Sequence, residues 1–112
     1  MNAASNYGIV ISNTESIPGR QIVEFYGVVS GNTVRAKHVG RDIMAGLKNI
    51  VGGELKGYTE LLQDSRNEAV DRMVQQAQSM GANAVVNVRF ATSSIAQGAA
   101  ELFAYGTAVR VS

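Results

Sequence analysis

Apolar and polar positions repeat with two different periods along this chain, and the clearest pattern lies between Tyr58 and Phe90. As far as Gly81, apolar residues recur at steps of three and four, which is the period of a helix with one apolar face. They are Leu61, Leu62, Ala69, Val70, Met73, Val74, Ala77 and Met80. The pattern predicts a long amphipathic helix. Gly81 is expected to end it, because glycine tolerates the left-handed conformation.

After this helix the pattern changes to the two-residue period of a strand. The even positions of residues 84–90 are all apolar, which predicts a strand buried on one face. Residues 91–99 are expected to form a turn region, and Ala100–Val111 a last strand. In that strand Phe103, Tyr105, Val109 and Val111 share one face, and Leu102, Ala104, Gly106 and Ala108 share the other. The small residues of the second face would let a helix or another subunit approach closely.

The first part of the chain predicts two more strands, Tyr7–Ile11 and Gln21–Ser30, separated by a loop and followed by a turn at residues 30–32. The second strand is apolar on both sides. Ile22, Tyr26 and Val28 fall on one side, and Val23, Phe25 and Val29 on the other. A strand of this kind must be covered on both faces. One layer of helices covers only one face, so we expect the other to be a subunit interface.

A first, shorter helix is expected to open near Arg41 and to end at Gly52 and Gly53. If it folds back on the long helix, Asp42 comes near Arg66 and Arg41 near Asp64. The predicted order is β-β-α-α-β-β. This order favours a two-layer α+β fold, in which an antiparallel sheet packs against two helices. We expect a single domain over residues 1–112.

Composition excludes several classes of function. The net charge is +1 and no basic run occurs, which argues against a nucleic-acid partner. The chain has no cysteine, so it has neither disulfides nor thiolate metal ligands. No segment approaches the roughly 20 apolar residues of a membrane span, and the N-terminus lacks the pattern of a signal peptide. We therefore expect a soluble, cytoplasmic protein with no membrane partner.

Catalytic motifs are also missing, so no catalytic residue is assigned and the chain is not expected to be an enzyme. Glu54 complements the dipole at the start of the long helix, or acts as a ligand group beside Tyr58 one turn on. Arg66 lies nearer the apolar stripe than its acidic neighbours, and Asp42 is the expected partner in a structural ion pair or an anion site. His38 is the one histidine; a solvent-exposed position is favoured over a metal ligand.

Three blocks of sequence together resemble one family. They are residues 41–54, residues 58–86 and the ending Tyr105-Gly106-Thr107-Ala108-Val109. This pattern resembles the YbjQ-like family of small bacterial proteins, which carries a heavy-metal-binding label. The resemblance implies a dodecin-like α+β subunit and a homopentameric ring, without an established activity. A metal ion is a possible ligand only if His38 or Glu54 is repeated around the axis of an oligomer, because zinc needs about four ligands.

Two interpretations of function remain open, and a third, weaker one is an enzyme that uses Glu54, Tyr58, His38 or Asp42 for acid–base work. The first is a non-enzymatic homo-oligomer that binds a small molecule or an ion at its interfaces or in an axial channel. Its candidate ligand-binding residues are Arg41, Asp42, Glu54, Tyr58 and Arg66. The second is a structural protein whose ring docks a protein partner. An apolar patch that stays exposed after assembly would favour the second interpretation.

Overall fold

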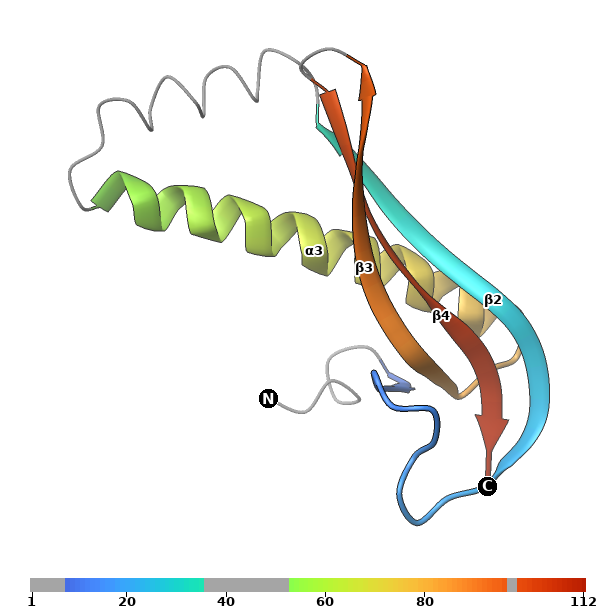
Figure 1. Ribbon diagram of the computed structural model, residues 1–112. Coiled ribbons are helices and arrows are strands. Elements are labelled where there is room, and N and C mark those ends of the chain that lie inside the picture. The colour runs from blue at the N-terminus through green and yellow to red at the C-terminus, as the bar shows by residue number, and fades with distance from the viewer. Residues whose placement is uncertain (1–7, 36–52, 97–98) are drawn as a thin grey trace.

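One long helix lies across a four-stranded sheet in the computed structural model (Figure 1), which describes residues 8–35, 53–96 and 99–112. The side chains of residues 34, 35, 53–61, 94–96, 99 and 100 are not described. The elements are β1 (Val10–Ile11), β2 (Ile22–Arg35), α3 (Gly53–Ser79), β3 (Ala84–Ala96) and β4 (Ala99–Val111). The α+β class and the long helix are thus confirmed. The expected first helix near Arg41 lies outside the described residues.

The sheet is mixed, with the strand order β1-β3-β4-β2. β4 is antiparallel to both of its neighbours, whereas β1 runs parallel to β3. The prediction of a purely antiparallel sheet is therefore wrong at β1. This strand is only two residues long, and it reaches the edge of β3 through Val10 opposite Ala84 and Ile11 opposite Val85. The following loop then carries the chain to the far edge of the sheet, where β2 begins.

β2 continues through the expected turn at residues 30–32, which is therefore not a turn. Gly31 has a different role, because α3 packs directly on the strand there. A Cβ atom at Gly31 would lie 2.2 Å from the carbonyl oxygen of Ala69 and 2.4 Å from the amide nitrogen of Met73. Only glycine allows two backbones to approach this closely. The expected turn at residues 91–99 is likewise mostly strand, since β3 extends to Ala96 and β4 starts at Ala99.

The main core lies between α3 and the sheet. Met73, Val74 and Ala77 of the helix pack against the face formed by Val29, Val85, Ala104 and Ala108, among others. Ala104 and Ala108 have no exposed surface, which confirms that the small face of the last strand admits the helix. A second, smaller cluster on the other face contains Ile17, Ala84, Val86, Val109 and Val111. In the part of the chain that the structure describes, only one end of that second face is covered.

The helix ends as the sequence predicts. Gly81 adopts a φ of 91°. Its amide donates to the carbonyl oxygen of Gln78 (3.0 Å), and the amide of Ala82 donates to the carbonyl oxygen of Ala77 (3.1 Å). This pair of bonds is the Schellman arrangement. Arg110 of β4 donates to the carbonyl oxygen of Gly81 at 2.5 Å and so ties the helix end to the sheet.

A bulge in β2 decides which of its side chains face the helix. The register shifts between Phe25 and Gly27, and Gly27 has a φ of 110°. Phe25 therefore lies opposite Val109 and Val28 opposite Thr107, on the face away from α3. Tyr26 packs against the helix-side core. The strict alternation assumed from the sequence, with Tyr26 and Val28 on one side, is wrong because the bulge inserts a residue.

We expect Gly31→Ala to lower the free energy of unfolding by about 1–3 kcal/mol, since the added methyl group overpacks the contact with α3. Urea unfolding followed by circular dichroism measures this loss. Ser30→Ala is the control: it changes only an exposed side chain on the same strand and should stay within about 0.5 kcal/mol of the parent. A Gly31→Ala protein as stable as the control would contradict the close packing.

Asn83 fastens the start of β3 to the end of β4, because its side chain accepts from the amide of Val111 (2.7 Å) and donates to the carbonyl of Val111 (2.9 Å). We expect Asn83→Ala to cost about 1–3 kcal/mol, since it leaves partly buried backbone groups without partners. The same unfolding experiment checks it, with the exposed Asn67→Ala as control. Equal stability of the two variants would show that water replaces both bonds.

Candidate functional site

Most of the predicted ligand-binding residues lie where the structure does not describe their side chains, so their grouping in one site stays a prediction. His38, Arg41 and Asp42 lie outside the described residues. Glu54 and Tyr58 belong to the first turns of α3, where side chains are not described. Arg66 is exposed, and is not partly buried in the subunit as expected. Its pairing with Asp42 stays a prediction.

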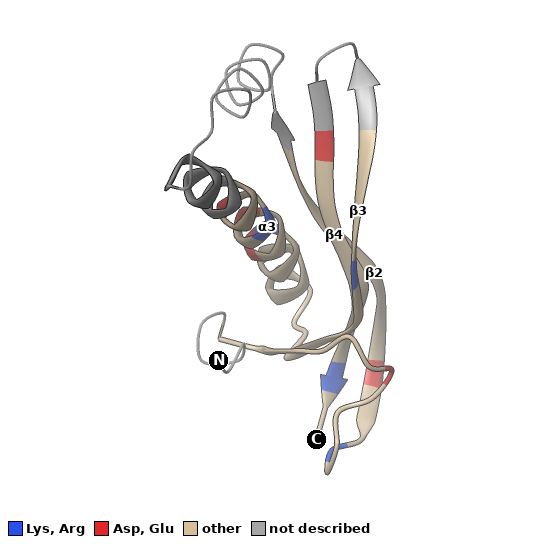
Figure 2. Ribbon diagram, turned by 60° about the vertical axis from the view of Figure 1, so that its left-hand side comes forward, with Lys and Arg blue, Asp and Glu red and all other residues tan. Residues whose placement is uncertain are grey.

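The face of the sheet turned away from α3 carries a band of large apolar side chains. We call it the outer apolar face; it consists of Ile22, Phe25, Val28, Phe103 and Tyr105, placed on one side by the strand register. Phe25 and Val28 are each 74% exposed. The rings of Phe103 and Tyr105 lie 5.8 Å apart. Charged residues are sparse on the described strands (Figure 2). The sequence had already singled out β2 as apolar on both faces, and this surface is the consequence.

The loop between β1 and β2 covers one end of this side of the sheet and no more. Ile17 is its buried anchor, packed on Val86, Val109 and Val111. The loop is held in shape by short-range bonds, such as the one from the Thr14 hydroxyl to the carbonyl of Ser16 (2.6 Å). The outer apolar face therefore stays open to solvent over most of its length.

The outer edge of β2 is open along only part of its length. The amide of Ser30 donates to Oε1 of Gln76 at 2.9 Å, and Arg72 donates to the carbonyl oxygen of Asn32. Arg72 is itself held by Glu68 at 2.5 Å. Side chains of α3 thus cover the outer edge of β2 at Ser30 and Asn32, which is one way in which proteins protect edge strands. Among the described residues, nothing covers the backbone edge of residues 22–28.

The opposite edge of the sheet is also open in part. β1 pairs only with Ala84 and Val85 of β3. The next two residues are held by the loop, since Asn87 donates to the carbonyl of Thr14 and Val88 to that of Ser12, both at 2.9 Å. Asn87 has a φ of 55° at a register shift. From Arg89 to Ala96 no described strand pairs with the outer side of β3.

Sequence reasoning missed both the protected and the open parts of these edges. Arg72 and Gln76 are four residues apart on the polar face of α3, a spacing that would look the same on any solvated helix. Their role in covering the edge of β2 depends on the close contact between α3 and Gly31, which a local sequence pattern does not show. The open edge of β3 depends on the length of β1, and element boundaries are poorly marked in the local pattern.

The described residues do not fit a heavy-metal site within one subunit. No group of three or more His, Cys, Asp or Glu residues gathers among them. Thiolates and imidazoles are the ligands that soft metals prefer, and the chain has no cysteine and one histidine. As for the membrane, the described part of the chain contains no helix with the length and apolar character needed to cross a bilayer.

Comparison with known proteins gives consistent relatives over nearly the whole chain. The YbjQ family profile, described as "Putative heavy-metal-binding", matches residues 9–112. A UPF0145 protein from Hahella chejuensis is 72% identical over 101 residues, which are 90% of this chain and 97% of that protein. One from Archaeoglobus fulgidus is 64% identical over 103 residues, which are 92% of this chain and 95% of that protein.

A solved structure shares the fold. It is a protein of unknown function of the DUF74 family from Pediococcus pentosaceus, with a TM-score of 0.61 and 14% sequence identity over 94% of this chain and 99% of that one. At this identity the likeness concerns the fold alone. The profile match and the high identity of the relatives confirm the resemblance found in the sequence: the chain belongs to the YbjQ-like family, whose curated members here are named UPF0145 proteins.

Proposed function

We propose that this chain is a non-enzymatic binding protein that assembles with copies of itself and holds a small ligand or an ion in the assembled form. The observation that carries the proposal is the exposure of Phe25 and Val28 on the outer apolar face. Apolar patches of this kind on small proteins mark interaction sites. Removing such side chains from water gains roughly 25 cal/mol per Å² of apolar surface.

A second copy of the chain is the occupant that best fits this surface. The sheet has two open edges, residues 22–28 of β2 and residues 89–96 of β3, and they belong to different strands. A contact between two different surfaces of identical subunits is heterologous, and its repetition forms a ring where the rotation between subunits closes. The resemblance to the YbjQ-like family supports a ring of five subunits. Gln76 and Arg72 leave residues 22–28 of β2 as the edge open to a partner, because they occupy the edge at Ser30 and Asn32.

The nature of the ligand follows from which residues the ring repeats around its axis. For a metal ion, the candidates are His38 and Glu54, since several copies of one residue could supply the ligands that one subunit lacks. For a small molecule, the interface residues Arg41, Asp42, Tyr58 and Arg66 remain the candidates. A cytoplasmic location agrees with both.

Native mass spectrometry after incubation with Zn²⁺ is the direct test of a metal site. Retained Zn²⁺ that His38→Ala removes supports the metal site, and no retained ion refutes it.

The alternative is that the ring is a structural platform for a protein partner. It requires apolar surface that remains exposed after assembly. Phe90 is 48% exposed on β3, outside the outer apolar face, and is the feature that keeps this alternative open.

We expect the double variant Phe25→Glu/Val28→Glu to dissociate the assembly, because it places two carboxylates in an apolar interface. Light scattering coupled to size-exclusion chromatography should give the parent as a multiple of the 11.9 kDa chain and the variant at a smaller mass. Gln63→Glu/Gln75→Glu adds the same charge to exposed positions of α3 and serves as the control. A parent of single-chain mass, or a variant of unchanged mass, would refute the interface.

A further inference from the structure

A hollow of about 550 Å³ opens between the loop after β1, the middle of α3 and the edge of β3. None of its lining residues belongs to the outer apolar face, but Arg89 lies opposite Tyr105 of that face in the strand register. Its floor is apolar, formed by Ile11, Val70 and Val88, and Phe90 adds an exposed aromatic wall. Its polar lining residues are Ser12, Asn13 and Arg89. An apolar floor with a few polar groups is the usual make-up of a small-molecule site.

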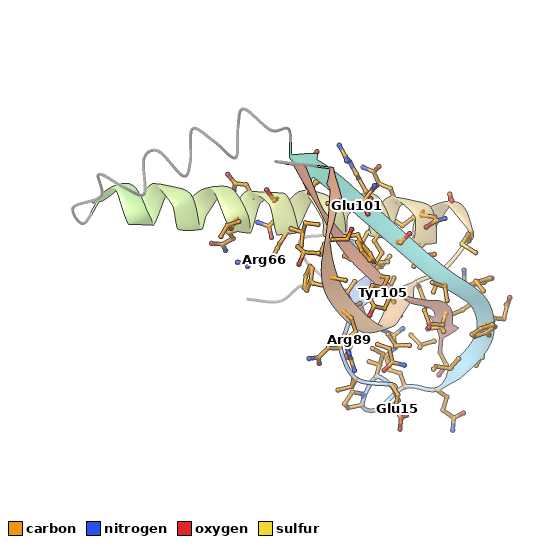
Figure 3. The ribbon with its side chains drawn as sticks, turned by 45° about the horizontal axis from the view of Figure 1, so that its top comes forward. Glu15, Arg66, Arg89, Glu101 and Tyr105 are labelled. Carbon is orange, nitrogen blue, oxygen red and sulfur yellow. The ribbon has the colours of Figure 1, made fainter. Side chains whose placement is uncertain are left out.

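Arg89 supplies the charge of this hollow. One of its terminal nitrogens, Nη1, donates to the carbonyl oxygens of Asn13 (2.7 Å) and Val88 (3.0 Å). These two bonds orient the guanidinium group, whose remaining donors on Nε and Nη2 have no partner among the described residues. No described carboxylate lies within 4.0 Å of it. Figure 3 shows Arg89 extending from β3, with Glu15 of the loop at a separate position.

A second arginine, Arg66, does not line the hollow but lies on the same helix as Val70, which does. Arg66 lies one turn before Val70 on α3, and residues four apart share a helix face. The residue three before Val70 is Asn67, so neither neighbour on this side is acidic. Arg66 is exposed, and its positive charge adds to that of Arg89. The positive charge of Arg89 beside an apolar floor repels metal ions and attracts anions, and Arg66 adds positive charge farther along α3.

We infer that this hollow binds a small amphipathic carboxylate. Its apolar chain lies on Ile11, Val70 and Val88, and its carboxylate accepts hydrogen bonds from the free fork of Arg89. Arginine suits this role because its planar donors match the two oxygens of a carboxylate. The inference rests on the proposed function as a binding protein and names the class of ligand. It places the ligand within one subunit, away from the residues that the sequence had suggested, Arg66 excepted.

Isothermal titration calorimetry with octanoate tests the inference, with octan-1-ol as a neutral ligand of equal chain length. The unmodified protein should bind octanoate at least about tenfold more tightly than octan-1-ol. Arg89→Gln should weaken octanoate binding about tenfold, which corresponds to about 1.4 kcal/mol, and should leave octan-1-ol binding unchanged. Arg20→Gln removes an equal charge from a loop residue that does not line the hollow and should keep octanoate affinity within about twofold.

Two further variants keep the test decisive, because Arg89→Gln also removes the bonds that hold the loop. Phe90→Ala removes the aromatic wall and should weaken both ligands. Arg66→Gln removes only an exposed charge and should weaken octanoate alone. Equal binding of octanoate and octan-1-ol to the unmodified protein, or octanoate binding that none of these three variants changes, would overturn the inference.

The assembly variant separates this inference from the proposed function. If Phe25→Glu/Val28→Glu binds octanoate with the same dependence on Arg89, the hollow is confirmed whether or not the parent assembles. If the parent assembles but binds no octanoate, only the hollow is refuted. If the assembly variant loses octanoate while Arg89→Gln retains it, the ligand lies on the outer apolar face, which also overturns the inference.

Discussion

The contact between α3 and Gly31 of β2 is the constraint on which the rest of the structure depends. Because residue 31 has no side chain, the helix backbone at Ala69 and Met73 lies directly against the strand. From that position Arg72 and Gln76 reach the outer edge of β2, and Met73 and Val74 fill the core over the small face of β4. Gly31 thus allows the short distance between α3 and the sheet. That short distance brings Arg72 and Gln76 to the edge of β2 and Met73 and Val74 into the core.

The same contact commits the helix to one face of the sheet. Among the described residues, the other face receives only the loop anchored by Ile17, and the bulge at Gly27 turns both Phe25 and Val28 toward this less protected side. A small domain has little core with which to offset such exposure. The proposed self-association would remove this exposure, because identical subunits could cover each other's apolar strands. The hollow beside Arg89 has no lining residue in common with this face, although Arg89 lies opposite Tyr105 in the strand register.

Features controlled by local chemistry could be predicted from the sequence. The periodic stripe of α3, its end at Gly81 and the small face of β4 follow from residue types at short spacing. The candidate site could not be predicted in the same way. Gly31 has the residue type of a turn until a helix is placed on it, and the bulge at Gly27 moves Val28 to the face opposite Tyr26. The hollow needs Ile11, Val70 and Val88 from three separate segments, so its only visible signal was an arginine within an apolar strand.

The central claim is that a single copy of this chain leaves an apolar sheet face uncovered and is therefore stable only as an assembly. Sedimentation velocity of the unmodified protein over a micromolar dilution series, with thermal unfolding recorded on the same samples, tests it most directly. The account predicts a species of several copies and a melting temperature that falls on dilution, since association stabilises the folded state by mass action. A well-folded single copy with a melting temperature independent of concentration would contradict it.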